Sequence, residues 1–252
     1  MMKITDYSKI ASKYDDNKLR HYIDPDINIS KILKENNTNQ ITVLDLACGT
    51  GNYLVKQIKE YKQYPIKWLG IDKSPDMLNI AKQKQLHAQL LLGDACDIPL
   101  DSESIDYIKI RFAFHHFNDK KKALKEIYRI LKKNGSVSIH NINHDYMQHS
   151  WVYKYYPQVE EIDKERFPST IDMYKWLDEM HFETQASVNT IIKKFYYKDI
   201  LEDANNRDMS QLNLISDEEY QIGLDKIIAD SKTNDYLLAD IAFMDFLGKK
   251  IR

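Results

Sequence analysis

Cysteine is scarce in this chain of 252 residues, which contains two of them. Cys48 and Cys96 each stand near the end of a predicted strand, and such sparse usage fits free thiols in a reducing compartment better than a secreted disulfide framework. Long apolar runs are also lacking. The N-terminal segment holds no apolar stretch of about 7 to 15 residues, as a signal peptide would, and no run approaches the roughly 18 apolar residues of a membrane span. We therefore expect a cytoplasmic protein that does not enter a membrane.

The chain also lacks an excess of either charge, since 36 basic side chains stand against 38 acidic ones and the formal net charge is -2. Without a basic field to gather phosphate groups, nucleic acid is not an expected partner. The hydrophobic fraction of 43 % and the charged fraction of 29 % are typical of a globular protein. A chain of this length can bury a stable core. Because no repeat and no linker rich in Pro, Gly or Ser interrupts it, we expect one domain over residues 1–252.

Between residues 41 and 142, short apolar runs alternate with amphipathic segments, which indicates βαβ units and a parallel sheet. Ser74 and Pro75 predict a helix start, and Asn134 with Gly135 predicts a helix stop. The expected strands are 41–46, 67–71, 89–92, 106–110 and 136–142, with helices at 53–61, 74–85 and 121–133; beyond them we expect a helix at 169–182, a strand at 183–191, two helices within 196–231, the second capped by Ser216, and a final strand at 237–250.

Glycine is sparse as well, and two of the seven glycines share the loop in "VLDLACGTGNY", residues 43–53. A strand that ends in such a loop before a helix places free backbone N–H groups at the carboxyl edge of the sheet, where open α/β sheets bind ligands. A dinucleotide fingerprint would need glycine where Leu54 stands, so a nucleoside without a diphosphate fits better than NAD. Asp45, Asp72 and Asp94 end three successive strands, and a carboxylate such as Asp72 can accept both hydroxyls of a ribose.

The segments "VLDLACGTGNYL", "WLGIDKSPDMLNIAK", "LLGDACDIP", "IDYIKIRFAFHHF" and "ALKEIYRILKKNGSVSI" resemble, in that order, the motifs of class I S-adenosylmethionine-dependent methyltransferases. The likeness is to the small-molecule branch that includes the ubiquinone and menaquinone C-methyltransferases. The N-terminal segment "YSKIASKYDD" also resembles the leading helix of that branch. It covers residues 5–142 well and is weaker beyond. It implies an α/β fold, a doubly wound, mostly parallel seven-stranded Rossmann-like sheet with helical cover insertions. The cofactor-binding core would take about 30–142 and the cover about 1–29, 143–168 and 195–235.

The same resemblance implies S-adenosyl-L-methionine as the cofactor, a small-molecule acceptor and a set of contacts in this chain. Asp45 would help hold the ammonium group of the cofactor, Asp72 the ribose, and Asp94 with Ala95 the adenine. Met77 would pack on the adenine, although a core position on a helix is the simpler interpretation. The implied cofactor contacts are Tyr14, Asp45, Ala47, Gly49, Gly51, Asp72, Lys73, Met77, Asp94, Ala95, Ile110 and Arg111, with Tyr7 as a further closing residue and Ala47 standing where many members have glycine.

Two adjacent histidines follow the fourth predicted strand. Adjacent residues are expected to point apart, and neither has a Cys, Asp or Glu at ligand spacing, so we expect no metal. By the resemblance, His116 is the candidate general base and His115 a structural residue. Further candidates for an acceptor pocket are His140, Asn141, His144, Tyr146 and His149.

Other interpretations stay open at this point. The lysines of 120–133 predict a solvated helix face, with a nucleic-acid patch as the alternative. The aromatic residues of "WVYKYYP" form the core of the cover or stack on a substrate. The chain could bind the cofactor without catalysis, or transfer an aminopropyl group on the same fold. The acceptor, the methylated atom type, the need for a base and the oligomeric state do not follow from the sequence.

Overall fold

The computed structural model describes residues 15, 23–36, 40–147, 149–207 and 209–251. The chain divides into two compact units. The described residues of the larger unit fall within Tyr7–His140, Tyr174–Ala186 and Asp245–Arg252, and those of the smaller unit fall mainly within Asn141–Met173 and Ser187–Met244. The expectation of one domain over the whole chain stays a prediction.

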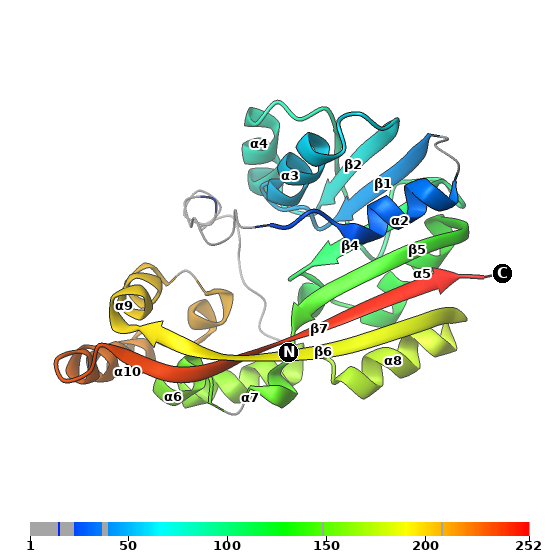
Figure 1. The fold of residues 1–252 in the computed structure, drawn as a ribbon. Helices are drawn as coiled ribbons and strands as arrows, with labels where there is room; N and C mark the ends of the chain where they lie inside the picture. The colour runs from blue at the N-terminus through cyan, green and yellow to red at the C-terminus, as the bar shows by residue number, and fades with distance from the viewer. Residues whose placement is uncertain (1–14, 16–22, 37–39, 148, 208, 252) are drawn as a thin grey trace. The chain divides into compact units, whose positions relative to one another are not determined.

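Helices and strands alternate along the chain until residue 142, and helices predominate afterwards (Figure 1). The elements are α2 (Ile27–Glu35), β1 (Ile41–Leu46), α3 (Asn52–Glu60), β2 (Ile66–Asp72), α4 (Pro75–Gln83), β3 (Gln89–Leu92), β4 (Ile105–Arg111), η3 (Phe114–His116), α5 (Lys120–Ile130), β5 (Leu131–Ile142), η4 (His144–Tyr146), α6 (Trp151–Tyr155), α7 (Pro157–Arg166), α8 (Thr170–Glu179), β6 (Phe182–Tyr196), α9 (Tyr197–Asn206), η5 (Ser210–Leu214), α10 (Asp217–Ser231) and β7 (Tyr236–Lys250).

The described strands form a seven-stranded sheet in the order β3-β2-β1-β4-β5-β7-β6. The first five strands pair in parallel, and β1 lies between β2 and β4, so the strand order reverses beside β1. This is the Rossmann-like arrangement that the sequence resemblance implies, and the predicted fold is confirmed. In such sheets ligands bind outside the carboxyl ends of the strands at the reversal.

Most predicted strand and helix ends agree with the structure to within a few residues, but β5 begins five residues before the predicted 136 and β6 ends five residues after the predicted 191. Ser74 caps α4, since its hydroxyl accepts the Met77 N–H at 3.3 Å, and Pro75 occupies the first helical turn. Ser216 and Glu219 form a capping box at the start of α10. These ends were predictable because a cap depends on local chemistry.

The helix stop predicted at Asn134 and Gly135 is wrong. Helix α5 ends at Ile130, and Leu131 already begins β5. The register with β4 then shifts, because Ile105 is opposite Leu131 whereas Tyr107 is opposite Ser136. The extra residues form an irregularity in which Asn134 has a φ of 66°, so these turn residues serve a bulge rather than a helix end. The predicted lysine face also ends early, and Lys132 of β5 pairs with Asp106 at 2.7 Å.

In the larger unit, α2, α3 and α4 bury apolar side chains in one cluster with β1 and β2. Each of these helices is amphipathic and turns an apolar face toward the sheet. Ile29 and Leu33 on α2 and Leu54 on α3 belong to these faces and are almost completely buried from solvent. Figure 1 shows α5 behind the sheet, seen from the side of α2 and α3. Strands β1 and β4 are therefore covered on both faces, as a central parallel sheet requires.

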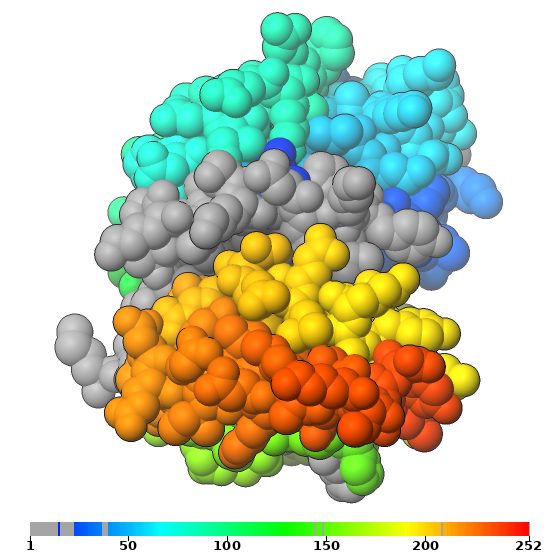
Figure 2. Space-filling view, turned by 90° about the vertical axis from the view of Figure 1, so that its left-hand side faces the viewer, coloured from blue at the N-terminus to red at the C-terminus, as the bar shows by residue number. Residues whose placement is uncertain are grey.

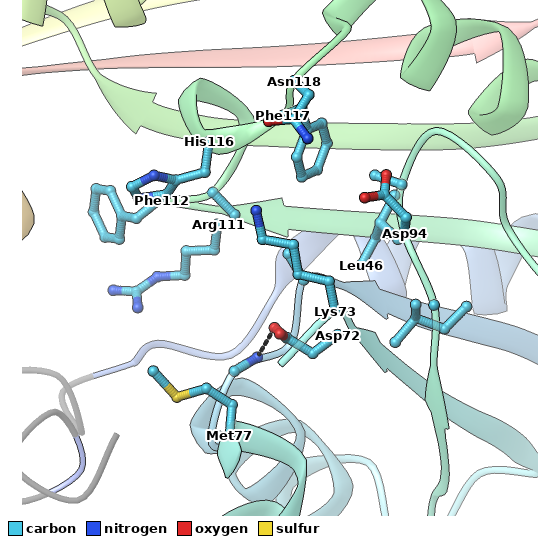
Figure 3. A pocket seen from close by; sticks show the side chains of 16 residues that line it. Leu46, Asp72, Lys73, Met77, Asp94, Arg111, Phe112, His116, Phe117 and Asn118 are labelled. Atoms are coloured by element: carbon cyan, nitrogen blue, oxygen red, sulfur yellow. Dashed lines mark hydrogen bonds between the residues drawn. The ribbon is translucent and has the colours of Figure 1, made fainter. Parts of the chain in front are cut away.

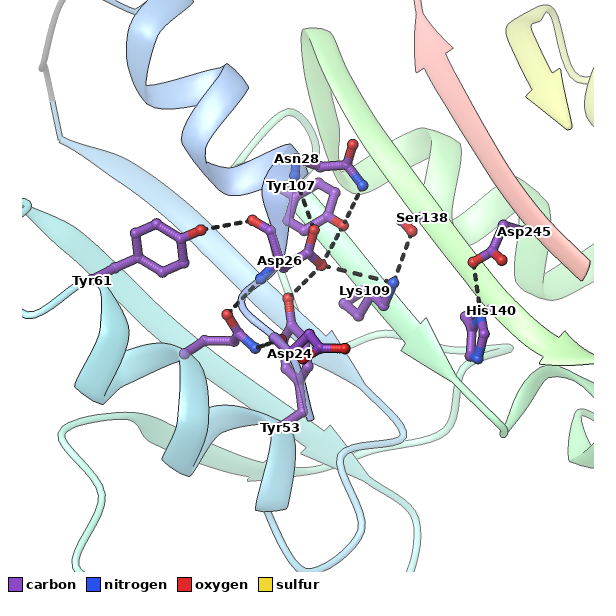
Figure 4. Close-up of polar contacts among 11 residues, drawn as sticks. Asp24, Asp26, Asn28, Tyr53, Tyr61, Tyr107, Lys109, Ser138, His140 and Asp245 are labelled. Carbon is purple, nitrogen blue, oxygen red and sulfur yellow. Dashed lines mark hydrogen bonds and ion pairs between the residues drawn. The ribbon is translucent and has the colours of Figure 1, made fainter. Parts of the chain in front are cut away.

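A buried polar cluster around Asp26 ties α2 to its neighbours (Figure 4). Its Oδ2 accepts hydrogen bonds from the hydroxyls of Tyr53 and Tyr107, both at 2.8 Å, and lies 3.7 Å from Lys109 Nζ. Its Oδ1 accepts the Asn28 N–H at 3.0 Å and so caps α2. Burial raises the pKa of both tyrosines well above their ordinary value, so they stay protonated donors. One carboxylate thus joins α2, α3 and β4.

The smaller unit has its own core, in which aromatic residues predominate. Trp151, Tyr155 and Tyr156 are 4 %, 3 % and 0 % exposed, which supports the interpretation of "WVYKYYP" as core. Gly223 of α10 lies against Tyr156, and a Cβ there would come within 2.1 Å of Cε1 of the ring, so only glycine fits. Figure 2 shows the outer sides of α9, in yellow, and α10, in orange. Helices α6 and α7 lie in a segment whose sequence shows no clean period.

Within the described parts of the chain, none of the helices combines the length and the apolar character that crossing a bilayer requires.

We predict that Asp26→Ala lowers the free energy of unfolding by about 3 to 5 kcal/mol, because it leaves two buried tyrosine hydroxyls without their acceptor and removes the negative charge beside the mostly buried Lys109. Urea denaturation followed by circular dichroism measures this change. Asp24→Ala is the matched control, since Asp24 is exposed and its backbone carbonyl alone accepts a bond from Gln57, at 2.9 Å; it should alter stability by no more than about 0.5 kcal/mol. Equal effects of the two substitutions would contradict a central role for Asp26.

Candidate cofactor and acceptor site

The loop between β1 and α3 adopts a left-handed backbone at Ala47, Gly49 and Gly51, with φ of 61°, 53° and 79°. The two glycines meet different demands. A Cβ on Gly51 would lie 3.1 Å from Leu86 Cδ1 and 3.3 Å from Ala81 Cβ, so packing inside the protein explains this glycine. A Cβ on Gly49 would meet nothing within 4 Å. Gly49 therefore faces open space, which a ligand could use for close approach to the backbone.

Asp72 at the end of β2 fixes this loop (Figure 3). Its Oδ2 accepts the Gly49 N–H at 2.8 Å, and its Oδ1 accepts the Ser74 N–H at 2.8 Å. Burial raises the pKa of Asp72, and the two backbone N–H groups partly oppose that rise. Each carboxylate oxygen has a second lone pair, so Asp72 can hold the loop and still accept hydroxyl groups of a ligand.

A pocket opens at the carboxyl ends of β1 to β4, within the larger unit. The predicted site residues that line it come from each of these strand ends and the segments that follow them. They are Ala47, Gly49, Asp72, Lys73, Met77, Asp94, Ala95, Arg111 and His116. Asp72 and Asp94 thus share one hollow beside Gly49, as the sequence predicts. Met77 is 4 % exposed yet still lines the pocket, so its core and pocket roles are compatible.

Some predicted residues are not among those that line the pocket. Gly51 lies at the start of α3, and Ile110 is fully buried in β4. Tyr14 and Tyr7 lie outside the described residues. Nor do the five candidates after β5 line this pocket: His140, Asn141, His144, Tyr146 and His149.

Sequence reasoning missed an apolar wall of the pocket, formed by Phe112, Ala113 and Phe117, with Asn118 beside it. Phe112 has a φ of 52°, an unusual conformation for an aromatic residue. The available signal was the dense aromatic run "RFAFHHF", which drew attention to its histidines instead.

Asp45, near the end of β1, is buried and is not among the residues that line the pocket. It is 3 % exposed, and its Oδ2 has no hydrogen-bond partner among the described residues. Burial and the neighbouring Asp72 carboxylate raise its pKa to about 7, against the opposing charges of Arg111 and Lys109. An orphaned carboxylate oxygen in a low dielectric costs free energy, so a cationic group that reached Asp45 would relieve that cost.

His115 and His116 correct the expectation that adjacent histidines point apart. Both lie in the short helix η3, and their ring centroids are 3.9 Å apart with planes inclined by 42°. The tight turn of η3 brings the rings together, whereas an extended backbone would separate them. His116 lines the pocket and His115 does not. Among the described residues there is no group of three or more His, Cys, Asp or Glu that could hold a metal ion.

Comparison with known proteins agrees with this geometry. Residues 44–139 match the family model described as a methyltransferase domain. The resemblance to methyltransferases is confirmed. The matched residues 44–139 include the glycine loop, the pocket and all three strand-end aspartates.

Among curated proteins, the demethylmenaquinone methyltransferase of Thermotoga maritima is 32 % identical over 143 residues, which make up 53 % of this chain and 58 % of the relative. The match thus spans less than two thirds of that relative's length. Among solved structures, a protein of Anabaena variabilis assigned as a methyltransferase of an antibiotic biosynthesis pathway has a TM-score of 0.63 and 19 % identity, with 88 % of this chain and 97 % of that one covered.

A second structural neighbour is the phosphoethanolamine N-methyltransferase 2 of Haemonchus contortus, which was solved with S-adenosylhomocysteine. Its TM-score is 0.56 at 17 % identity, and the match covers 96 % of this chain and 58 % of that chain. At such identities the two structures bear on the fold, and the fold of this chain is that of methyltransferases.

We predict that Asp45 makes stability depend on pH. Its folded pKa of about 7 lies above the ordinary value of 3.8, so its stabilising contribution is present below pH 4 and is lost as the pH rises through 7. The loss amounts to about 4 kcal/mol, since each pKa unit corresponds to about 1.4 kcal/mol. Unfolding free energies at pH 5 and pH 8 should therefore differ more in the wild type than in Asp45→Asn.

The matched control is Asp101→Asn, because Asp101 is an exposed carboxylate. This variant should keep the pH dependence of the wild type. An unchanged pH dependence in Asp45→Asn would show that Asp45 is ionised in the folded protein throughout this range.

Proposed function

We propose that this chain transfers a methyl group from S-adenosyl-L-methionine to a small-molecule acceptor. The observation that carries the proposal is the open space at Gly49, whose N–H is held by Asp72, together with the buried Asp45 oxygen that has no partner among the described residues. The match of residues 44–139 to a methyltransferase domain supports it, as do the names of the relatives, which transfer methyl groups to small molecules.

The pocket residues fit the parts of this cofactor. Asp72 has free lone pairs for the ribose hydroxyls, and Asp45 offers a carboxylate to the ammonium group. Gly49 lets the aminocarboxypropyl chain approach the loop. The family resemblance leads us to assign further residues to the cofactor: Tyr14, Ala47, Gly51, Lys73, Met77, Ile110 and Arg111.

Asp94 and Ala95 are the residues that we assign to the adenine. Oδ1 of Asp94 accepts the Cys96 N–H at 2.8 Å, which fixes the carboxylate in the turn after β3. Oδ2 then suits the exocyclic amine, and the Ala95 N–H suits a ring nitrogen. A preset turn lowers the entropy cost of binding.

The bound cofactor would supply an electrophilic methyl group on a positively charged sulfur. The protein then has to align the acceptor, exclude water and, where the acceptor requires it, remove one proton. Phe112 and Phe117 give the pocket an apolar wall that excludes water. The role of His116 as general base stays a prediction.

The remaining expectations about partners and location stay proposals. We propose no nucleic-acid partner, because the net charge is close to zero, and a cytoplasmic location, because the cysteines suit a reducing compartment. Aminopropyl transfer would need an acidic binding site for a polyamine, and no such site is evident in the sequence.

Calorimetric titration with S-adenosylmethionine and S-adenosylhomocysteine tests cofactor binding. Both ligands should bind the wild type, and Asp72→Asn should weaken binding by about 1 to 3 kcal/mol, or roughly 5 to 150-fold, because the ribose hydroxyls lose a charged acceptor. Asp101→Asn is again the matched control and should bind as the wild type does. Absence of binding to the wild type would refute the proposal.

Gly49→Ala and Gly51→Ala separate ligand approach from packing. Gly49→Ala should fold, at a cost of about 1 kcal/mol for its positive φ, and bind the cofactor at least about tenfold more weakly, because its methyl group enters the open space. Gly51→Ala should lower the melting temperature more, since its methyl group contacts Leu86 and Ala81. If Gly49→Ala bound as tightly as the wild type, the cofactor would not approach the loop there.

Radiolabelled donor, incubated with the protein and the small-molecule fraction of a bacterial extract, tests catalysis. A methyltransferase should label a product that chromatography can isolate. A module that binds the cofactor without catalysis would bind in calorimetry and label nothing.

A further inference from the structure

A second histidine, His140, does not line the pocket but contacts the lining residue Phe112 and is paired with a carboxylate. His140 Nδ1 is 2.7 Å from Oδ1 of Asp245, which comes from β7 (Figure 4). The side chain of His140 is 22 % exposed and that of Asp245 is 47 % exposed. Both residues belong to the larger unit, and Figure 4 shows the other ring nitrogen of His140 on the side away from Asp245.

Backbone pairing places His140 beside Arg111 and Phe112, two residues that line the pocket. In the pairing of β4 with β5, His140 lies opposite Arg111, and its carbonyl accepts the Phe112 N–H at 2.8 Å. The rings of Phe112 and His140 meet edge to face, with centroids 4.8 Å apart. Arg111 and Phe112 both line the pocket, so His140 adjoins the segment that follows β4, where the acceptor would lie.

Asp245 can orient His140 to act as a base, because its carboxylate lies within hydrogen-bond distance of Nδ1. Although burial acts to raise the pKa of Asp245, the hydrogen bond with His140, the charge of that ring and the charge of Lys109 together lower it. An ionised Asp245 accepts a proton from Nδ1 and so holds the neutral ring with its lone pair on Nε2. It also stabilises the cation that forms when Nε2 takes up a proton.

We propose that His140, oriented by Asp245, is the general base that deprotonates the acceptor. The inference rests on the proposed methyl transfer and narrows its substrate class to acceptors whose reacting atom carries a dissociable proton, such as a hydroxyl or amine. The acceptor atom forms a bond to the methyl carbon as the carbon–sulfur bond breaks. The electron pair of the broken bond stays on sulfur, and the acceptor proton goes to Nε2 of His140.

The geometry favours His140 over His116 for this role. The ring of His116 lies against that of His115, and the two side chains are 9 % and 5 % exposed. His140 has a carboxylate within hydrogen-bond distance for its cationic form. Among the described residues, Asp245 from β7 is paired with His140, Lys109 from β4 acts on the charge of Asp245, and Arg111 is opposite His140 in the pairing of β4 with β5.

The first experiment needs no acceptor and no cofactor. Long-range ¹H–¹⁵N NMR of the histidine side chains reports which ring nitrogen carries the proton. In the wild type His140 should be the Nδ1–H tautomer, and in Asp245→Asn it should shift toward the Nε2–H tautomer. A wild-type His140 that carries its proton on Nε2 would overturn the proposal.

The second experiment uses the product that radiolabelled donor forms in the extract fraction. His140→Gln should lower kcat by about 10² to 10⁴-fold and remove the acidic limb of the pH–rate profile, while S-adenosylhomocysteine binds with unchanged affinity. Asp245→Asn, which alters a positioning residue, should lower kcat less and shift that limb. His87→Gln is the control, because His87 is exposed and does not line the pocket.

The outcomes separate the two proposals. If the wild type labels no product, the proposed function fails, and the base assignment fails with it. If the wild type labels a product and His140→Gln keeps its kcat and its pH profile, only the base assignment fails. Loss of the acidic limb in His116→Gln, with His140→Gln unaffected, would assign the proton to His116.

Discussion

The hydrogen bond from the Gly49 N–H to the carboxylate of Asp72 is the interaction on which the site depends. It joins the end of β1 to the end of β2 and holds a loop whose backbone is left-handed at three positions. Such a backbone costs free energy wherever a side chain is present, as at Ala47, and it persists because Asp72 and the neighbouring strand fix it. The Cys48 N–H adds a second tie, to the Ile71 carbonyl at 2.9 Å. The loop is therefore preorganised with open space at Gly49.

Asp26 and Asp45 are both buried carboxylates, and they differ in whether neighbouring groups compensate the charge. Asp26 is buried with donors from two tyrosines, a backbone N–H and a lysine, so its charge is compensated inside the protein. Asp45 is buried as deeply, but its Oδ2 has no partner among the described residues and its pKa is raised to about 7. A satisfied carboxylate stabilises the fold, whereas an unsatisfied one stores free energy that a ligand can release. This difference is the reason that we assign Asp45, and not Asp26, to the cofactor.

The sequence predicted the part of the fold that depends on local periodicity and on strand ends. The strands from β1 to β4, the caps at Ser74 and Ser216, and the meeting of Asp72 with Asp94 all follow from patterns within a few residues. The irregular start of β5 did not, because Asn134 and Gly135 favour a turn without specifying whether a helix or a strand contains it. The pairing of His140 with Asp245 was also out of reach, since 105 residues separate the partners and only the placement of β7 beside β5 brings them together.

The sequence specifies the residues assigned to the cofactor more strongly than those assigned to the acceptor. The structure gives a physical reason for this difference. Contacts assigned to the cofactor come from the ends of consecutive parallel strands, where each residue lies a fixed step beyond its strand. Contacts that we assign to the acceptor side come from the segment after β4, where Phe112 has an unusual backbone and η3 brings two histidine rings together. They also come from β7, which lies beside β5 in the sheet although it is at the far end of the chain. Such positions depend on long-range packing, so substitutions there can change the acceptor while the sheet and its glycine loop stay intact.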